Sequence, residues 1–486
     1  MLKKTIKIVA FIICVSLIMT FVVKILRFKS SDGIDQMHAF YKNPENTVDV
    51  LFLGSSHMYT NVNTGILWSE YGISAYDLGA AEQPFWNTYF CLKEALKTQK
   101  PKVIVLEIFS ATFHSAEFQT ERWTIDNLYG MNFNLNFVEA VNKSIKEGWY
   151  ADYLNRFARY HSRYTMITED DFKYDSGMEN FKGFVPKFGT NPQEKTNVHH
   201  VSEATFSNEK MGDYLMKIID LAGAEDIPVM LVCAPYATNE GSQEIFNAIY
   251  QYADKKKVPY IDCNVRYDEL EIDFSQDFVD WSHLNEKGNV KYTNYLGNYL
   301  DENYELPDHR GDERYASWDR NAELLEHELI AYQLVQTSDF STYLDQINRD
   351  DYIVMMSARN MGNDFQLSEE ALQKLAGIGM DTEMVNQYGN IVLYNGVEKF
   401  SNNELNYQWY MEDGTSDFCM EREYVESVSG KYEETMHDAS RMIVDGVNYF
   451  QDGYKLNIVV YDTVLNRVVD AVGIKVREET SIIRGN

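Results

Sequence analysis

Ser56, Asp280 and His283 have the residue types and the chain order that acyl transfer through a serine requires. A serine hydroxyl is a weak nucleophile until a histidine accepts its proton and a carboxylate holds that histidine in the right tautomer. Asp280 and His283 are three residues apart, in the sequence Asp-Trp-Ser-His. This spacing places both side chains on one side of a single turn, so one ring nitrogen can meet the carboxylate while the other faces Ser56. Each motif also arises by chance, and only their combination predicts a catalytic triad.

The elements around these residues predict an α/β fold. Residues 48–53 are apolar and run into Gly54, which indicates a buried strand that ends in a sharp turn at the carboxyl edge of a sheet, where clefts form. The periodicity places further strands at 74–78, 102–108, 227–234 and 260–262, and helices at 64–71, 86–98 and 208–224. Strands that alternate with helices predict a parallel sheet covered on both faces.

Residues 46–304 resemble the SGNH (GDSL-like) hydrolase superfamily, in particular its extracytoplasmic acyltransferase and esterase branch in Gram-positive bacteria, which includes D-alanyl transfer proteins of teichoic acids. Gly54-Ser55-Ser56-His57 matches the first block of that superfamily, with Ser56 as the nucleophile, and Asp280 and His283 match the last block. Gly79 matches the second-block glycine, whose backbone N–H helps the N–H of Ser56 to bind the oxyanion. The resemblance implies a flavodoxin-like three-layer α/β/α domain that needs no cofactor.

The third block departs from the superfamily pattern. The strand at 102–108 is followed by Phe-Ser-Ala-Thr, where the superfamily has a glycine and an asparagine that donates to the oxyanion. Loss of one such donor typically costs about 3 to 4 kcal/mol of transition-state stabilisation. Gln83 or Asn87 is therefore expected to replace it, although either amide could equally belong to a solvated loop. Asn87 and His57, the residue after the nucleophile, are also expected beside the substrate.

Between the third strand and the helix at 208 lie about a hundred residues, 113–206, without a clear strand. Such an insertion typically forms a helical lid or part of a substrate cleft. It contains Arg-Tyr-His-Ser-Arg-Tyr at 159–164, an aromatic and basic cluster in an acidic chain. We expect His161 or Arg163 to line the cleft and bind an acyl carbonyl or an anionic group, with a salt-bridged helix face as the equal alternative.

The first thirty residues predict a membrane segment. Lys3, Lys4 and Lys7 precede sixteen uncharged residues, 8–23, which more basic residues follow. The run is short for a spanning helix and long for a secretory signal, and no small-x-small cleavage site follows it. We therefore expect an uncleaved signal-anchor, a single pass through the cell membrane with the body outside.

The charge of the remaining chain excludes several partners. Residues 1–30 hold six of the 44 basic residues and none of the 74 acidic ones, so the body carries a formal charge of about −36. Such a body is repelled by nucleic acid and by anionic lipid, which predicts a domain near the membrane that does not lie on it. Five cysteines, with no Cys-x-x-Cys and no histidine-rich cluster, predict neither a disulfide scaffold nor a metal site.

The chain is long enough for two domains. We expect the SGNH-like domain at 31–305, a linker at 306–320 that contains proline, glycine and many charges, and a smaller α/β domain at 321–486. A strand at 352–357, a helix at 369–377, a strand at 390–394 and a hairpin of 456–462 with 467–472 resemble the interleukin-like EMT inducer (ILEI) type domain. This resemblance implies a carbohydrate-associated binding module. Residues 400–445 match no pattern.

Two functions are consistent with these observations. The first is a membrane-anchored serine O-acyltransferase or esterase that acts on a cell-envelope polysaccharide, with an acyl donor supplied by a membrane-bound O-acyltransferase partner. The second is a non-catalytic scaffold, in which the fold persists without the third-block asparagine and the C-terminal module binds glycan or a partner protein. Retention of the serine, the aspartate and the histidine together favours the first function.

Overall fold

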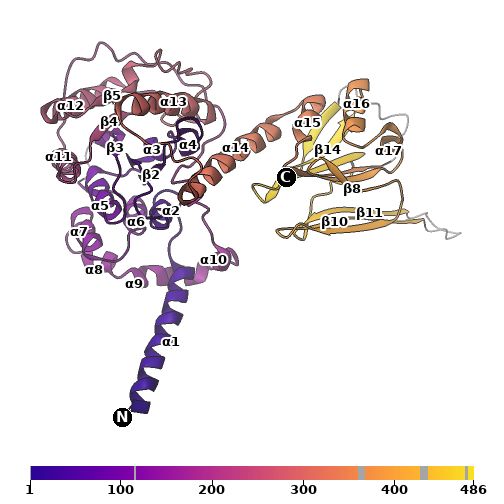
Figure 1. The fold of residues 1–486 in the computed structure, drawn as a ribbon, viewed down its shortest axis with the longest axis horizontal. Helices are drawn as coiled ribbons and strands as arrows, with labels where there is room; N and C mark the ends of the chain where they lie inside the picture. The colour runs from indigo at the N-terminus through magenta and orange to yellow at the C-terminus, as the bar shows by residue number, and fades with distance from the viewer. Residues whose placement is uncertain (1, 114–116, 360–366, 427–435, 477–479, 486) are drawn as a thin grey trace. The chain divides into compact units, whose positions relative to one another are not determined.

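The computed structural model describes residues 2–113, 117–359, 367–426, 436–476 and 480–485, and these divide into two compact units, one up to Leu325 and one from Glu326. The first unit is built on a five-stranded parallel sheet with the order β2-β1-β3-β4-β5 (Figure 1). Its strands are β1 (Val50–Gly54), β2 (Ala75–Gly79), β3 (Val103–Glu107), β4 (Val229–Cys233) and β5 (Tyr260–Asp262). The expected parallel α/β architecture is confirmed.

Helices cover both faces of this sheet, which explains why its strands are almost continuously apolar. The helices that follow the strands in turn are α4 (Thr64–Tyr71), α5 (Phe85–Ala95), α11 (Glu209–Ala224), α12 (Glu240–Lys256) and α13 (Glu286–Asn303). The contacts pair α4 with α13 and α5 with α11, and right-handed crossovers in this strand order put the two pairs on opposite faces.

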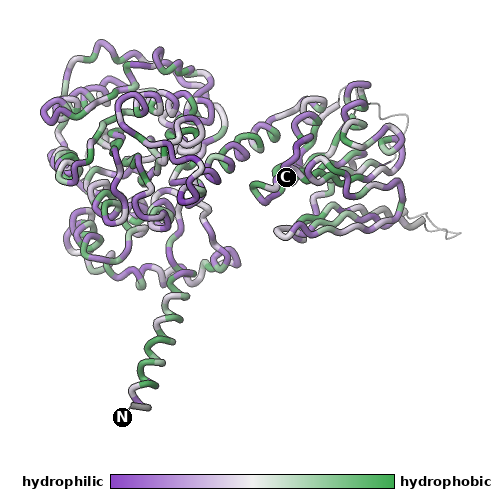
Figure 2. Tube along the Cα trace, in the orientation of Figure 1, coloured by the Kyte–Doolittle hydropathy of each residue, from purple (hydrophilic) through white to green (hydrophobic). Residues whose placement is uncertain are grey.

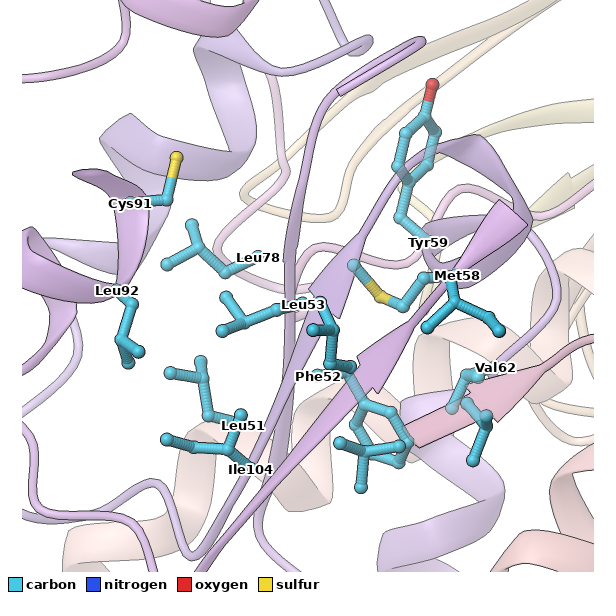
Figure 3. Close-up of a cluster of buried hydrophobic side chains, with 14 of the residues drawn as sticks. Leu51, Phe52, Leu53, Met58, Tyr59, Val62, Leu78, Cys91, Leu92 and Ile104 are labelled. Carbon is cyan, nitrogen blue, oxygen red and sulfur yellow. The ribbon is translucent and has the colours of Figure 1, made fainter. Parts of the chain in front are cut away.

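The apolar core lies directly behind the turn that carries Ser56. Figure 3 shows Leu51 and Leu53 of β1 next to Leu78 and Leu92, with Met58 close by. All of these side chains are buried, as are Phe52 and Ile104 on the neighbouring positions of the sheet. Burial of each such side chain stabilises the fold by about 1.5 to 3 kcal/mol, so the end of β1 is anchored firmly.

The insertion at 113–206 is helical in its first part and has no strand in the portion that the structure describes. Its helices are α6 (Glu121–Leu128), α7 (Leu135–Ser144), α8 (Tyr150–Leu154), α9 (Arg156–His161), η2 (Ser162–Met166) and α10 (Asp170–Lys173). They pack against α5, against α2 (Ile34–Phe40) and against the N-terminal helix, and so do not form the expected lid. Instead, an irregular segment, 182–193, passes the site: Val185 N–H donates to the carbonyl of Tyr59, and Gly189 O accepts from Asn285.

The N-terminal helix α1 (Leu2–Leu26) is apolar along most of its length (Figure 2). Residues Lys4–Leu26 are long and apolar enough to cross a membrane, which is consistent with a single-pass anchor and also with a signal sequence. The helix is exposed until its last turn, where Ile25 and Leu26 are buried against the first unit.

Residues 306–320, which we expected to form a linker, are part of the first unit. They include η4 (Glu313–Tyr315) and the start of α14 (Ala316–Gln336). Tyr315 and Trp318 are buried in the same core as the parallel sheet, and the Trp318 Nε1–H donates to the carbonyl of Ala75 at 2.9 Å. The proline, glycine and charged residues of this stretch therefore mark a turn on a packed surface.

The second unit is mainly antiparallel β, with a six-stranded sheet of order β15-β14-β13-β6-β7-β8 and a four-stranded sheet of order β12-β11-β10-β9. The larger sheet contains β6 (Tyr352–Ala358), β7 (Asn390–Tyr394), β8 (Val397–Asn402), β13 (Leu456–Asp462), β14 (Arg467–Val476) and β15 (Thr480–Arg484). The smaller sheet contains β9 (Tyr407–Glu412), β10 (Asp417–Glu426), β11 (Met436–Val444) and β12 (Val447–Asn448), and so fills the region that matched no pattern.

One face of the larger sheet packs on α15 (Phe340–Ile347), α16 (Glu369–Gly377) and α17 (Thr382–Asn386), and the other face packs on the smaller sheet. The expected strands and helix of this unit are present, but its sheets are antiparallel because consecutive strands are joined mostly by short turns.

Substitution Trp318→Ala tests the placement of residues 306–320. We expect it to lower the free energy of unfolding of the first unit by about 3 to 5 kcal/mol, because it removes a buried indole and leaves the Ala75 carbonyl without its donor. Urea unfolding followed by tryptophan fluorescence measures it, since six of the seven tryptophans lie before residue 325. Arg314→Ala, at an exposed ion pair, is the control with little effect. A linker would tolerate both substitutions equally.

Candidate active site

Ser56 is the first residue of the short helix α3 (Ser56–Tyr59), directly after β1. Gly54 at this turn and Gly79 beside it in β2 allow the strand ends to approach closely. Gly54 has φ of 155°, and a Cβ on it would lie 2.8 Å from the Cβ of Glu107; a Cβ on Gly79, its partner in β2, would lie 2.5 Å from the carbonyl oxygen of Gly54. Any side chain at either position would force the strands apart, so the glycines bring the ends of β1, β2 and β3 together beneath Ser56.

The structure brings Ser56, His283 and Asp280 together. His283 Nε2 lies 2.8 Å from Ser56 Oγ, and His283 Nδ1 lies 2.9 Å from Asp280 Oδ2. With the ring proton on Nδ1, that nitrogen donates to the carboxylate and Nε2 accepts the proton of the serine hydroxyl. The three groups form the hydrogen-bond chain that activates a serine nucleophile.

Asp280 is held in place by its own turn. Its Oδ1 accepts the backbone N–H groups of Ser282 and His283 at 2.8 and 2.9 Å, and the Ser282 hydroxyl at 3.1 Å. Partial burial tends to raise the pKa of Asp280, but the hydrogen bonds from His283 and from the two backbone N–H groups outweigh it and lower the pKa. The carboxylate therefore stays ionised and fixes the tautomer of the ring.

Asn61, which sequence reasoning missed, joins the two halves of the site. It is buried, and its Oδ1 accepts the N–H of Leu284, the residue after His283, at 3.1 Å. Its backbone carbonyl accepts the hydroxyl of Thr293 in α13. Since Asn61 is only five residues after Ser56, it sets the distance between the nucleophile and the histidine. An asparagine in a loop gives no sequence signal of such a role.

His57 lies behind the triad and not at an open surface. Its ring is completely buried and stacks on Phe109, with 3.5 Å between ring centroids and 8° between planes, while the ring of His283 is 5.2 Å away. Burial lowers the pKa of His57 well below its usual value, and the nearby His283 lowers it further. His57 is therefore a neutral support for His283, and the expected contact with substrate is replaced by this packing.

Trp281, which lies between Asp280 and His283 in the sequence, is exposed at the same site. Its side chain is 57% exposed, and its ring lies 6.5 Å from Phe109 and 6.2 Å from Tyr236. These rings form an aromatic wall next to His283. Sequence reasoning did not find this wall, because its members come from three distant segments.

The expected replacements for the missing asparagine are both buried. Gln83 Nε2 donates to Thr88, and its Oε1 accepts the thiol of Cys91. Asn87 Oδ1 accepts the hydroxyl of Ser144 in the insertion, while its Nδ2 has no partner among the described residues. The amide donor of Gln83 is therefore engaged away from the triad, whereas a role of Asn87 at the oxyanion stays a prediction.

Arg163 and His161 belong to the base of α1 and not to the site. Arg163 Nη1 donates to the carbonyls of Leu26 and Arg27 at the end of α1, and its Nη2 pairs with Asp171 at 2.9 Å. His161 is exposed on α9, next to Tyr164. The reason is the packing of α9 against α1, which the sequence pattern did not predict.

Glu107 is an ionisable group buried under the nucleophile turn. It ends β3, its Oε1 accepts the N–H of Phe109 at 2.9 Å, and its other oxygen has no partner among the described residues. Burial raises its pKa to about 8. The side chain is therefore mostly protonated at neutral pH and adds no negative charge beneath Ser56. Among the described residues, no group of three histidine, cysteine or acidic side chains could hold a metal ion.

Neither a protein-family model nor a curated protein matches this chain. Among solved structures, it is similar to one described as an acylhydrolase from Bacteroides fragilis, at 12% identity over 55% of this chain and 94% of that one, with a TM-score of 0.29. A GDSL-like lipase from Bacteroides thetaiotaomicron matches at 12% identity over 52% and 87%, with a TM-score of 0.25. At these values the site must be judged on its own geometry.

Substitution Asn61→Ala tests the link between the two halves of the site. We expect the rate at which Ser56 reacts with a fluorophosphonate probe to fall by about ten- to a hundredfold, because His283 loses its fixed position. Intact-mass spectrometry follows the labelling, and the melting temperature is measured in parallel. The matched control is Asn289→Ala, because Asn289 is also a buried asparagine and lies in α13. Equal labelling rates in all three proteins would contradict this role of Asn61.

Substitution Glu107→Gln tests the protonation of the buried carboxyl. A folded pKa of about 8, above the ordinary glutamate pKa of 4.5, means that the folded state holds the extra proton between these values, so Glu107 costs stability as pH rises through that window. The amide cannot ionise. We therefore expect the stability difference between variant and parent to shift in favour of the variant by up to about 1.4 kcal/mol per pH unit between pH 5 and 8. Parallel pH profiles from denaturant unfolding would contradict this.

Proposed function

We propose that the first unit is a serine esterase or O-acyltransferase, held at the outer face of a cell membrane by α1, and that its substrate is a cell-envelope polysaccharide. The observation that carries this proposal is the hydrogen-bond chain from Ser56 Oγ through His283 to Asp280. Its position supports the proposal further, because it lies at the carboxyl edge of a parallel sheet, where ligands of open α/β sheets bind.

The reaction follows from this geometry. Ser56 Oγ attacks the carbonyl carbon of an ester, and its proton passes to His283 Nε2. The tetrahedral intermediate collapses when the leaving alcohol takes that proton, and the acyl group stays on Ser56. A second hydroxyl, from water in an esterase or from a sugar in a transferase, then gives its proton to His283 and attacks the acyl-serine. His283 passes that proton to Ser56 Oγ as the bond between Oγ and the acyl carbon breaks, which restores Ser56. Asp280 remains ionised throughout and stabilises the charged ring.

The oxyanion is assigned to backbone donors. The N–H groups of Ser56 and Gly79 are our candidates, because β1 and β2 approach closely at Gly54 and Gly79. The Gln83 amide donates to Thr88, and the Asn87 contact with Ser144 engages only its oxygen, so we assign no side-chain amide as the third donor. One donor fewer is worth about 3 to 4 kcal/mol, so we expect slow turnover unless the substrate or a partner supplies the missing contact.

The aromatic wall supports a sugar as the acceptor or as the acyl carrier. An exposed indole next to the catalytic histidine offers a flat apolar face and a polar edge, which suits the two faces of a pyranose ring. The acidic body suits neutral or cationic substrates. Location beside a membrane also suits an acyl donor delivered by a membrane-bound O-acyltransferase partner.

A non-catalytic scaffold is the second candidate. The observation that favours it is the absence of the third-block asparagine together with the pairing of the Gln83 amide with Thr88. In that case the fold and the second unit, as a glycan- or protein-binding module, would carry the function. A turnover experiment separates the two candidates.

The first experiment is hydrolysis of p-nitrophenyl acetate by the full chain in detergent. We expect measurable activity that falls at least about a thousandfold in Ser56→Ala and in His283→Ala, since each removes a group that acts in both half-reactions. Intact-mass spectrometry should find one fluorophosphonate adduct in the parent and none in Ser56→Ala.

The matched controls are Ser275→Ala and His200→Ala, a serine and a histidine at exposed positions away from the triad, and both should keep full activity. Activity that survives Ser56→Ala would exclude the proposed nucleophile. A folded parent chain that neither turns over nor forms an adduct would favour the scaffold.

A further inference from the structure

Five apolar side chains stand exposed within sixteen residues of the insertion. We call this segment, residues 157–172, the α9–α10 ledge. Its exposed apolar members are Phe157, Tyr164, Met166, Ile167 and Phe172. Met166 is 68% exposed, although single apolar residues are usually scattered on a soluble surface. A concentration of this kind marks a surface that contacts another apolar phase or partner.

The ledge lies at the C-terminal end of α1. Figure 1 shows α9 and α10 on either side of the point where α1 joins the first unit, and α1 packs against both. Arg163 binds the last carbonyls of α1, and Asp171 pairs with both Arg163 and Lys29. These bonds fix the ledge to the helix, so a membrane that holds α1 determines where the ledge lies.

The length of α1 places the first unit close to that membrane. Sixteen uncharged residues, 8–23, span about 24 Å at 1.5 Å per residue, whereas a bilayer core is about 30 Å thick. The last of them, Val22 and Val23, already pack against the first unit. Because α1 continues without a break into residues that pack against the first unit, a bilayer that holds the uncharged run lies next to the base of the body.

Charge supports lipid as the partner. Residues 24–29 contain three basic and no acidic residues, and the ledge, residues 157–172, contains two basic and three acidic residues. The base of α1 and the ledge together are therefore positive, in a chain whose formal net charge is −30. Apolar side chains among basic ones are typical of segments that lie in the interface of an anionic membrane.

We propose that the α9–α10 ledge inserts its apolar side chains into the interfacial zone of the bilayer that holds α1, as a second membrane contact of the body. The inference rests on the proposed anchoring by α1. It also replaces the expectation, drawn from net charge, that the body does not lie on lipid: the base of α1 and the ledge together carry more basic than acidic residues, so this face is an exception. Two contacts would fix the orientation of the first unit relative to the membrane.

The test uses an environment-sensitive fluorophore on single cysteines of the full chain. The native Cys14, exposed in α1, is labelled in the parent; the other four cysteines are buried. The second protein is Cys14→Ser with Met166→Cys. The matched control is Cys14→Ser with Tyr250→Cys, at an exposed aromatic residue of α12, which Figure 1 shows at the far end of the first unit from α1.

Each protein is reconstituted into vesicles of phosphatidylcholine and phosphatidylglycerol that contain a lipid spin-labelled near the headgroup, which reports on positions 166 and 250, or a lipid spin-labelled near the end of its acyl chain, which reports on Cys14 in the middle of the span. We expect quenching at position 166 on the order of threefold greater than at position 250, because interfacial side chains insert about 5 to 10 Å. Quenching at Cys14 with none at position 166 would overturn the proposed membrane contact of the ledge, whether position 166 faces water or is covered by a protein. Absence of quenching at Cys14 would overturn the anchoring and the ledge together. Ester hydrolysis, measured on the same samples, reports the proposed chemistry separately.

Discussion

The candidate site depends on one hydrogen bond, from Ser56 to His283, that joins residues 227 positions apart. Neither element could hold it alone. Ser56 is fixed because β1 is buried and because Gly54 and Gly79 allow a close approach of strands, and His283 is fixed by the Asp280 turn and by the N-terminus of α13, which Asn285 caps. Asn61 connects the two sides, so the geometry of the triad is a property of the whole parallel sheet.

The electrostatics of the site separate ionised from neutral groups. Asp280, at the edge, is kept ionised by hydrogen bonds, whereas His57 and Glu107, which are buried, are kept neutral at pH 7 because low-dielectric surroundings disfavour their charged forms. A charged group behind His283 or beneath Ser56 would compete with the charge that develops during acyl transfer. Because His57 and Glu107 are buried as neutral groups, the Asp280 carboxylate is the charged group that acts on His283.

The insertion has a role different from the one that its length suggested. Its helices pack on α5, α2 and α1, while the irregular segment 182–193 passes the site. Arg163, in the cluster that looked like a substrate-binding motif, instead closes the open carbonyls at the end of α1, where a cation is favourable. The insertion thus connects the proposed catalytic unit to its proposed anchor, which explains why basic and exposed apolar side chains gather there.

The sequence by itself determined the features that depend on short spacing: the five strands of the parallel sheet and three of its helices, four strands and a helix of the second unit, the turn at Gly54, and the Asp280 and His283 pair. Local patterns suffice there because periodicity and single-turn spacing fix which side chains share a face. Only the tertiary structure decided that Gln83 and Arg163 have partners away from the triad, that His57 is buried against Phe109, that residues 306–320 pack in the core, and that Asn61 and Trp281 belong to the site. The partner of a polar side chain is set by which distant segments pack beside it, and a single sequence carries no local signal of that packing.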